Sequence, residues 1–270
     1  MTVHDGTFSR RTLLGGAGAL VIGVALPAGF GRALAQAPTA PPPPPPVDPN
    51  AFVHVGADDT VTVLIKHIEM GQGPMTGLST LVAEELDADW AQMRAEHAPA
   101  NQRLYANLFM GLQGTGGSTA MANSYMQMRR AGAMARWLLV QAAAQSWGVP
   151  AEQIAVKDGV IAHGRSGRKG RFGEFTAAAA KLTAPQDVPL KDPRQFTKIG
   201  HDRSVGRVDS LAKSTGAAKF SIDQTAPGML TAVVAHPPRF GAKVAKFDAA
   251  AAMKVKGVVA VRQIPTGVAV

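Results

Sequence analysis

Two glycine-rich runs carry the residues of this chain that could do chemistry. The first run is Glu69-Met70-Gly71-Gln72-Gly73-Pro74. It joins a predicted strand over 60–68, rich in Val and Ile, to a predicted helix over 75–86. A turn through glycines into a helix start directs free backbone N–H groups and the positive end of the helix dipole at one spot. Such a spot suits a phosphate or an oxo anion, and the Gln72 amide adds a group that can donate and accept there.

The second run repeats this arrangement before a predicted helix over 120–147. Its residues are Gln113-Gly114-Thr115-Gly116-Gly117-Ser118-Thr119. Backbone amides and three hydroxyls can surround a phosphate there. A dinucleotide fingerprint needs a third glycine at Thr119 and a preceding strand, and a P-loop needs Lys-Ser/Thr after its last glycine, so the run fits neither. A flexible loop capped by Ser118 is the structural alternative, but two such loops favour one shared polyphosphate ligand.

The composition restricts how a cofactor could be bound. The 270 residues, 46% of them hydrophobic, suffice for one large or two smaller domains, and no cysteine is present. Disulfides, cysteine-ligated zinc and iron–sulfur clusters are therefore excluded within this chain. A bound cofactor must supply any redox chemistry. None of the seven histidines is spaced i,i+4 from a second ligand on a predicted helix, so no protein-ligated metal site is predicted.

Residues 1–35 are typical of a twin-arginine export signal. Arg10 and Arg11 precede a weakly hydrophobic run over 13–26, and the segment 33–35 supplies the small residues that a signal peptidase reads. The run is shorter than the roughly 20 residues of a membrane span, so no transmembrane segment is expected apart from the signal. Because this route carries folded proteins, often with cofactor inserted, the signal predicts a periplasmic protein.

The rest of the chain is predicted to be an α+β protein with two domains. Residues 36–50 form a linker that contains six consecutive prolines, which make a stiff spacer. Residues 51–185 alternate between strand and helix patterns, and 186–207 lose periodicity and are interpreted as a second linker. Residues 208–270 form the second domain. Since Val270 ends an apolar strand-like run, we expect the chain to be the N-terminal piece of a longer protein.

Several local elements follow from the same patterns. In the first domain we expect a hairpin over 52–68, a short strand at 95–97, a hairpin over 154–162 and a helix over 174–182. In the second domain a helix is predicted near 249–253, together with four strands. These strands are Ala217–Ile222, Met229–Ala235, Ala242–Phe247 and Val258–Ile264.

The basic residues do not indicate a nucleic-acid partner, although the formal net charge is +9. Many of the cations lie in the run over 165–171, which follows a predicted turn at Asp158-Gly159. This run lacks interleaved aromatic residues, and aromatic residues make up only 6% of the chain. We therefore interpret it as a solvated loop.

The order of these motifs resembles the molybdopterin-binding subunit of the xanthine oxidase/aldehyde oxidoreductase family, in particular its exported isoquinoline 1-oxidoreductase-type β subunits. The resemblance rests on the two glycine runs, on the acidic stretch over 81–87 and on the small-residue helix after the second run. Residues 213–261 resemble the α/β hammerhead domain of that family. The implied fold is an incomplete molybdopterin-binding domain followed by an incomplete α/β hammerhead domain.

The resemblance implies an enzyme that oxidises an aldehyde or an N-heteroaromatic small molecule with oxygen derived from water. It implies molybdopterin cytosine dinucleotide as cofactor, a small [2Fe-2S] partner subunit and a cytochrome c acceptor. The implied cofactor-binding residues are Gly71, Gln72, Gly73, Gln113, Gly114, Gly116, Gly117, Ser118 and Thr119.

One departure from the family pattern concerns the catalytic base. The family uses a glutamate in a late Gly-X-Gly-Glu motif, which this chain lacks, so we expect that base beyond residue 270 and no activity from these residues alone. Glu174 follows Gly173 but is interpreted as a helix N-terminal acid, and Glu69 is assigned a structural role. The alternatives are a non-enzymatic exported ligand-binding module and an inactive truncated copy.

Overall fold

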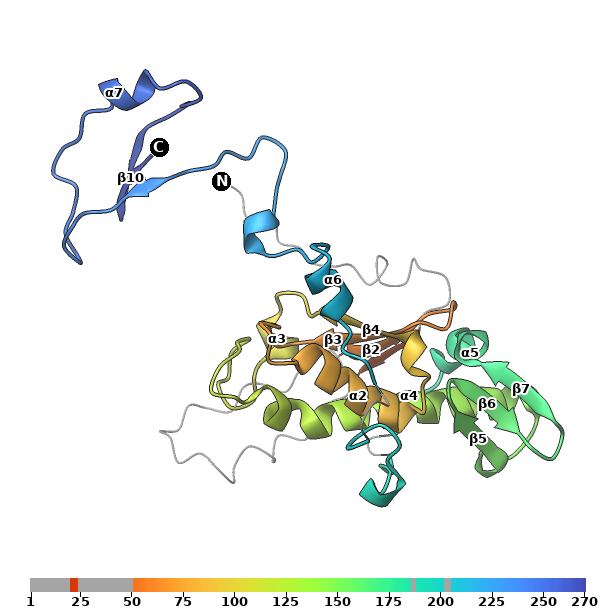
Figure 1. The fold of residues 1–270 in the computed structure, drawn as a ribbon. Coiled ribbons are helices and arrows are strands. Elements are labelled where there is room, and N and C mark those ends of the chain that lie inside the picture. The colour runs from red at the N-terminus through yellow and green to blue at the C-terminus, as the bar shows by residue number, and fades with distance from the viewer. Residues whose placement is uncertain (1–19, 24–50, 186–187, 202–204) are drawn as a thin grey trace. The chain divides into compact units, whose positions relative to one another are not determined.

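The chain forms two units in the computed structural model, which describes residues 20–23, 51–185, 188–201 and 205–270. The first unit ends at Thr215 and the second begins at Gly216 (Figure 1). This division falls later than the predicted boundary between 207 and 208. The predicted spacer over 36–50 and most of the predicted export signal lie outside the described residues.

A four-stranded sheet forms the centre of the first unit, in the order β1-β2-β3-β4. The strands are β1 (Leu20–Gly23), β2 (Ala51–Val55), β3 (Val61–Ile65) and β4 (Met93–His97). β2 and β3 form the predicted antiparallel hairpin, which turns through Asp59 at φ 70°. β1, which lies in the apolar run of the predicted signal, pairs antiparallel with β2. β4, also predicted, pairs parallel to β3.

Two helices pack side by side on this sheet and run in the same direction (Figure 1). They are α2 (Pro74–Leu86) and α4 (Ala120–Trp147). A Cβ on Gly77 would lie 2.9 Å from Met121 Sδ, and one on Gly132 would lie 2.7 Å from the Val82 carbonyl oxygen. The contacts thus advance together along both helices, and both N-termini lie at one end of the pair.

The hydrophobic core lies between the sheet and this helix pair. β3 alternates buried and half-buried positions, because one face of the strand is turned to the helices. The fully buried side chains include Ile65, Leu78, Leu86, Met128 and Leu139. α4 ends at Gly148, which adopts φ 63° as a left-handed C-cap. Both predicted helices are therefore confirmed, with their N-termini fixed directly after the glycine runs.

A second sheet in the first unit has three strands in the order β5-β6-β7. They are β5 (Ile154–Lys157), β6 (Val160–His163) and β7 (Arg168–Arg171), followed by α5 (Phe172–Ala179). The predicted solvated loop over 165–171 is therefore wrong in its second half. β7 pairs with β6 through main-chain hydrogen bonds that do not depend on polar side chains. Its buried position is Gly170, which the Phe175 ring covers.

The described part of the predicted linker packs on the first unit. Backbone N–H groups of Thr197, Lys198 and Ile199 donate to the Glu84 carboxylate in α2 at 2.6–3.1 Å. The remaining short elements of this unit are 3₁₀ turns and two helices. They are η1 (Trp90–Gln92), α3 (Gln102–Tyr105), η2 (Ala151–Gln153), η3 (Pro193–Gln195) and α6 (Ser210–Ser214).

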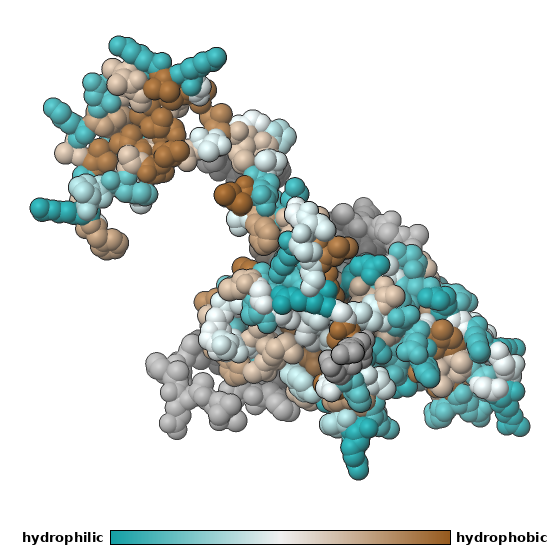
Figure 2. Space-filling view, viewed as in Figure 1, coloured by the Kyte–Doolittle hydropathy of each residue, from teal (hydrophilic) through white to brown (hydrophobic). Residues whose placement is uncertain are grey.

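The second unit has little regular structure. It contains η4 (Ser221–Asp223), β8 (Val234–Ala235), α7 (Ala250–Met253), β9 (Arg262–Ile264) and β10 (Gly267–Ala269), with the sheet order β8-β10-β9. The predicted strands over 217–222 and 242–247 are wrong, and the other two are shorter than predicted. The physical reason is that this unit supplies few partners: Ile222 is 92% exposed, and apolar surface gathers on the unit in Figure 2. The mixed helix and sheet content agrees with the α+β prediction, and the hammerhead assignment stays a prediction.

Candidate functional site

The structure brings the two glycine runs together at the N-terminal end of the helix pair. The Ile68 N–H in front of the first run donates to Thr115 Oγ1 in the second at 2.8 Å. The buried His67 Nε2 lies 3.0 Å from Ser124 Oγ in α4. Lys66 Nζ donates to the Ala106 carbonyl at 3.1 Å. Three consecutive residues at the end of β3 therefore hold the segment 106–124 beside the first run.

The first run is closed by its own glutamate. Glu69 Oε1 accepts the N–H groups of Gly71 at 2.8 Å and Gly73 at 3.1 Å, and Oε2 accepts the Met75 N–H at 3.2 Å. Both glycines have positive φ, 106° and 92°, which lets the chain wrap around this carboxylate. The amides predicted to face a ligand anion thus already have an anionic partner. Glu69 has the structural role predicted for it, as a cap of α2.

Electrostatics of the closed loop favour the charged form of Glu69. Burial acts to raise the pKa of its carboxyl, but the N–H donors of Gly73, Met75 and Gly71 lower that pKa overall, with help from the Lys213 charge. Arg207 Nη2 also lies 3.2 Å from Glu69 Oε1. A carboxylate that is held this firmly as an anion is poorly suited to act as a general base near neutral pH.

Gln72 also satisfies its own loop in this structure. Its Oε1 accepts the Met70 N–H at 2.7 Å, and its Nε2 donates to the Ile68 carbonyl at 2.7 Å. Gln113 acts in the same way at the second run, where Oε1 accepts the Asn101 N–H and Nε2 donates to the Pro99 carbonyl. Both predicted glutamine ligands therefore shape loops in this structure.

A buried asparagine, which the sequence did not single out, organises the second run. Asn107 Nδ2 donates to Thr119 Oγ1 at 2.8 Å and to the Gly114 carbonyl at 3.4 Å, while its Oδ1 accepts the Phe109 N–H. The Thr119 hydroxyl in turn donates to the Gly116 carbonyl. No periodicity or spacing marks a single asparagine in an irregular segment, so only the structure identifies it.

Unlike the first run, the second run leaves donors open at its helix. Thr119 provides no side-chain cap for α4. Within the described part of the chain, the N–H groups of Gly117 and Ser118 and those of residues 120–122 have no hydrogen-bond partner. Asn123, 7% exposed in the first turn, has neither amide atom satisfied. Buried polar groups without partners are rare and call for an explanation. An anionic ligand at the start of α4 would supply the missing acceptors.

The backbone of the second run is also open to a ligand. Gly116 has an ordinary φ, and a Cβ there would meet no atom within 4 Å, so internal packing gives no reason for a glycine. Ser118 adopts φ 54°, a left-handed conformation that non-glycine residues seldom adopt outside functional loops. The absence of side-chain atoms at Gly116 allows a ligand to approach the main chain.

Two buried ionisable groups stand behind this run. Burial lowers the pKa of Lys66 to about 8. Burial and the Lys66 charge lower the pKa of His67, while the Gly114 backbone opposes that shift. His67 was interpreted from the sequence as a core or edge residue, and its burial confirms this. The alternation of β3 gave no sign that a lysine side chain would be buried at its end.

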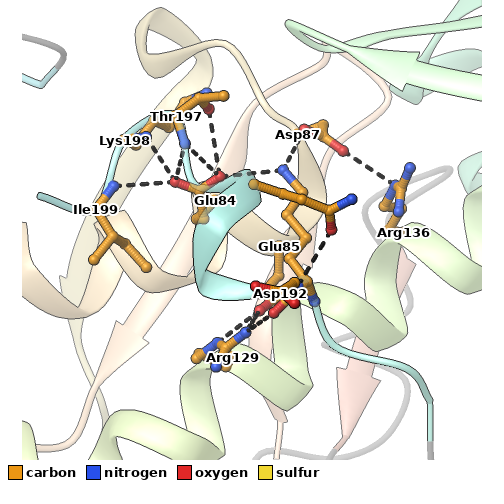
Figure 3. A network of polar contacts seen from close by, with 11 residues as sticks. Glu84, Glu85, Asp87, Arg129, Arg136, Asp192, Thr197, Lys198 and Ile199 are labelled. Atoms are coloured by element: carbon orange, nitrogen blue, oxygen red, sulfur yellow. Dashed lines mark hydrogen bonds and ion pairs between the residues drawn. The ribbon is translucent and has the colours of Figure 1, made fainter. Parts of the chain in front are cut away.

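The acidic stretch over 81–87 forms a structural network (Figure 3). The Glu84 carboxylate points at the backbone of the segment 197–199, as described above, and also accepts Lys191 Nζ at 3.2 Å. Glu85 pairs with Arg129 of α4, with Oε1 2.5 Å from Nη2. The Arg129 guanidinium lies 5.0 Å from the centre of the Phe196 ring. This network ties α2, α4 and the segment 188–201 together, away from any open donor.

No candidate catalytic base emerges from the described residues. Glu174 Oε1 accepts the Arg171 N–H at 2.6 Å at the start of α5, in agreement with its prediction as a helix N-terminal acid. In the described ranges, no group of three or more His, Asp or Glu side chains is arranged to hold a metal ion. Among the same residues, no helix has the length and apolar character needed to cross a bilayer.

An open cavity of about 590 Å³ lies elsewhere in the first unit, between β4 and the segment 206–212. Trp90 closes one side, with Nε1 3.0 Å from the Gly206 carbonyl oxygen. Arg207 and Asp209, which also line the cavity, pair with each other at 2.8 Å. The cavity therefore offers fewer open donors than the start of α4, which is the better candidate for an anion site.

Comparison with known proteins supports a pterin cofactor. The sequence profile of the molybdopterin cofactor-binding domain family matches residues 19–226. The β subunit of isoquinoline 1-oxidoreductase from Brevundimonas diminuta is 35% identical over 97% of this chain and 38% of its own length. The membrane-bound aldehyde dehydrogenase [pyrroloquinoline-quinone] of Gluconacetobacter polyoxogenes is 30% identical over 78% and 27%, respectively. A nicotinate dehydrogenase subunit from Pseudomonas putida is 31% identical over 70% and 15%. The chain spans about two fifths of the first relative's length and less of the other two.

Proposed function

This chain belongs to the molybdopterin cofactor-binding domain family, and we propose that it is the N-terminal part of the large subunit of an exported molybdenum hydroxylase. The family profile and the 35% identity to an isoquinoline 1-oxidoreductase β subunit confirm the resemblance to the xanthine oxidase/aldehyde oxidoreductase family. The larger size of that relative supports a full subunit that continues past Val270.

The proposed reaction oxidises an aldehyde or an N-heteroaromatic small molecule with oxygen derived from water. The names of the three relatives, which mention isoquinoline, an aldehyde and nicotinate, support this substrate class. When bound, the molybdenum–pterin group would supply the redox chemistry and the site of oxygen transfer. The described residues of this chain would bind and orient that group, because they contain no candidate general base.

The single observation that carries the proposal is the set of open donors at the start of α4. Unpaired N–H groups at 117–118 and 120–122, together with the orphaned Asn123 amide, suit the phosphate oxygens of a pterin nucleotide. Gly114, Gly116, Gly117, Ser118 and Thr119 would form the binding loop. The other predicted residues (Gly71, Gln72, Gly73 and Gln113) would set the position of that loop, because their polar groups are already engaged in protein contacts.

The finer parts of the proposal concern the cofactor form, the partners and the compartment. We propose molybdopterin cytosine dinucleotide as cofactor and a small [2Fe-2S] subunit as partner. Electrons would pass to a cytochrome c acceptor, since this chain has no cysteine to hold a cluster. The twin-arginine pattern at Arg10 and Arg11 supports delivery of the folded, loaded protein to the periplasm.

Two alternatives have different readouts. A non-enzymatic exported binding module would retain a ligand without redox turnover, and an inactive truncated copy would retain neither cofactor nor turnover. One relative is named for pyrroloquinoline quinone, which is a third cofactor outcome to measure.

The test is cofactor analysis of the full-length protein, purified with its partner from a host that makes both cofactors. We expect molybdenum and pterin nucleotide in equimolar amounts with the subunit. Gly116→Val should lose both at unchanged thermal stability, whereas Gly164→Val, at another glycine with ordinary φ and an open Cβ position, should retain them. Molybdenum at background level, or quinone in its place, would contradict the proposal.

A further inference from the structure

A buried lysine beside the second glycine run has no counter-charge. Lys66 is 4% exposed, and its Nζ makes one hydrogen bond, to the Ala106 carbonyl at 3.1 Å. No carboxylate among the described residues forms an ion pair with it. An ammonium group carries three donors, so two remain without a partner inside the protein. A buried and unpaired charge is costly, and one that is kept calls for a partner that the protein itself does not provide.

The surroundings of Lys66 are those of the proposed anion site. Its acceptor Ala106 precedes Asn107, whose side chain binds the Gly114 carbonyl and Thr119 Oγ1. The next residue in sequence, His67, contacts Ser124 in the first turns of α4. The cation is thus built into the frame that holds the start of α4, where backbone donors and the Asn123 amide also lack acceptors.

We propose that Lys66 is the buried counter-charge of the cofactor and binds a phosphate oxygen of the pterin nucleotide held at the start of α4. This inference rests on the proposed function and deepens it by naming the group that selects an anionic ligand. Lys66 is a binding residue in this account and takes no part in the chemistry at the metal.

Cofactor binding should then be linked to proton uptake. Burial lowers the pKa of Lys66 to about 8 in the empty site, and a bound phosphate would favour the charged form and raise that pKa. The ionisable groups that its contacts place beside it are His67, whose pKa lies below 6.5, and Tyr105, whose pKa burial raises above 10.0. Between pH 7 and 9.5 Lys66 is therefore the one group of this set that changes charge.

The test uses the full-length protein with its partner subunit, loaded with cofactor, and the variants Lys66→Met and Lys66→Arg. Lys157→Met, at an exposed lysine in β5, serves as the matched control. The readouts are molybdenum and pterin content per subunit, thermal unfolding of the cofactor-free protein, and the rate of cofactor release between pH 7 and 9.5. None of these depends on turnover.

We expect Lys66→Met to retain at least tenfold less cofactor while its empty form unfolds at the wild-type temperature or above. Lys66→Arg should keep part of the cofactor and Lys157→Met all of it. Release from the wild type should accelerate as the pH rises through this window, and release from Lys66→Arg should not. Wild-type cofactor content in Lys66→Met, or wild-type release that is independent of pH, would overturn the inference and leave the proposed function standing. If the wild type itself contains no pterin, the proposed function fails.

Discussion

Replacement of Glu84 by glutamine should destabilise the first unit by several kcal/mol, although Glu84 touches no proposed ligand. Its carboxylate is fully buried and accepts the N–H groups of Thr197, Lys198 and Ile199, at distances down to 2.6 Å. It also accepts Lys191 Nζ at 3.2 Å. An amide keeps one acceptor oxygen and turns an NH₂ group toward donors that have no other acceptor.

The magnitude follows from the number of donors that are left unpaired. Hydrogen bonds to charged groups contribute about 1.5–3 kcal/mol each, and breaking a buried ion pair costs about 3–5 kcal/mol. Asp87 remains as a second acid for Lys191, so part of the ion-pair term survives. We therefore expect about 3–5 kcal/mol for Glu84→Gln near neutral pH.

The pH dependence of this effect has a definite sign. Burial acts to raise the pKa of Glu84, but the Lys198 and Ile199 N–H groups and Lys191 lower it below 4.5 overall. A carboxyl group with a lowered pKa stabilises the fold above pH 4.5, and this contribution is lost as the pH falls through the lowered value. The difference between wild type and Glu84→Gln should shrink over that acidic range.

The assay is urea unfolding of both proteins, with Glu152→Gln at an exposed acid of η2 as the control. Hydrogen–deuterium exchange of the segment 188–201 should rise in Glu84→Gln and stay unchanged in the control. A loss of less than about 1 kcal/mol, or unchanged exchange in this segment, would refute the assignment of Glu84 as its anchor.

Three other changes test the frame of the site. Gly132→Val should lower stability by about 1–3 kcal/mol, because a Cβ there lies 2.7 Å from the Val82 carbonyl oxygen; a melting temperature equal to the wild type would contradict the close contact of α2 and α4. Glu69→Gln should cost about 1 kcal/mol through loss of the cap, and this difference should vanish in acid as the lowered pKa of Glu69 is passed; a difference that persists there speaks against the cap. Thr115→Val removes the acceptor of the Ile68 N–H, so exchange of that amide should accelerate roughly tenfold, and unchanged exchange would show that the two runs are held together by other contacts.

The sequence predicts the first unit well because its signals are local. Pro74 and Gly148 mark a helix start and a helix end by backbone chemistry alone, and both helices form there. The β2–β3 hairpin follows from alternation around a turn at Asp59. Such features depend on residues close in sequence, so they can be read without knowledge of the packing.

Tertiary contacts decide what the sequence could not predict. The donors of Gly71 and Gly73 are taken by Glu69, and no pattern reveals which of several acids turns back into its own loop. The basic strand β7 forms because its main chain pairs with β6. Burial of Lys66 and of Asn107 depends on segments that are brought together only by folding. Most of the predicted strand residues of the second unit lack a partner within the described chain.

The central claim is that the start of α4 and the run before it hold the anionic part of a pterin cofactor. Hydrogen–deuterium exchange of the full-length protein, compared with and without cofactor, tests this most directly. We predict protection concentrated at 114–123, with no change in the control hairpin over 154–163. Protection confined to other segments, with 114–123 exchanging equally in both states, would contradict the claim.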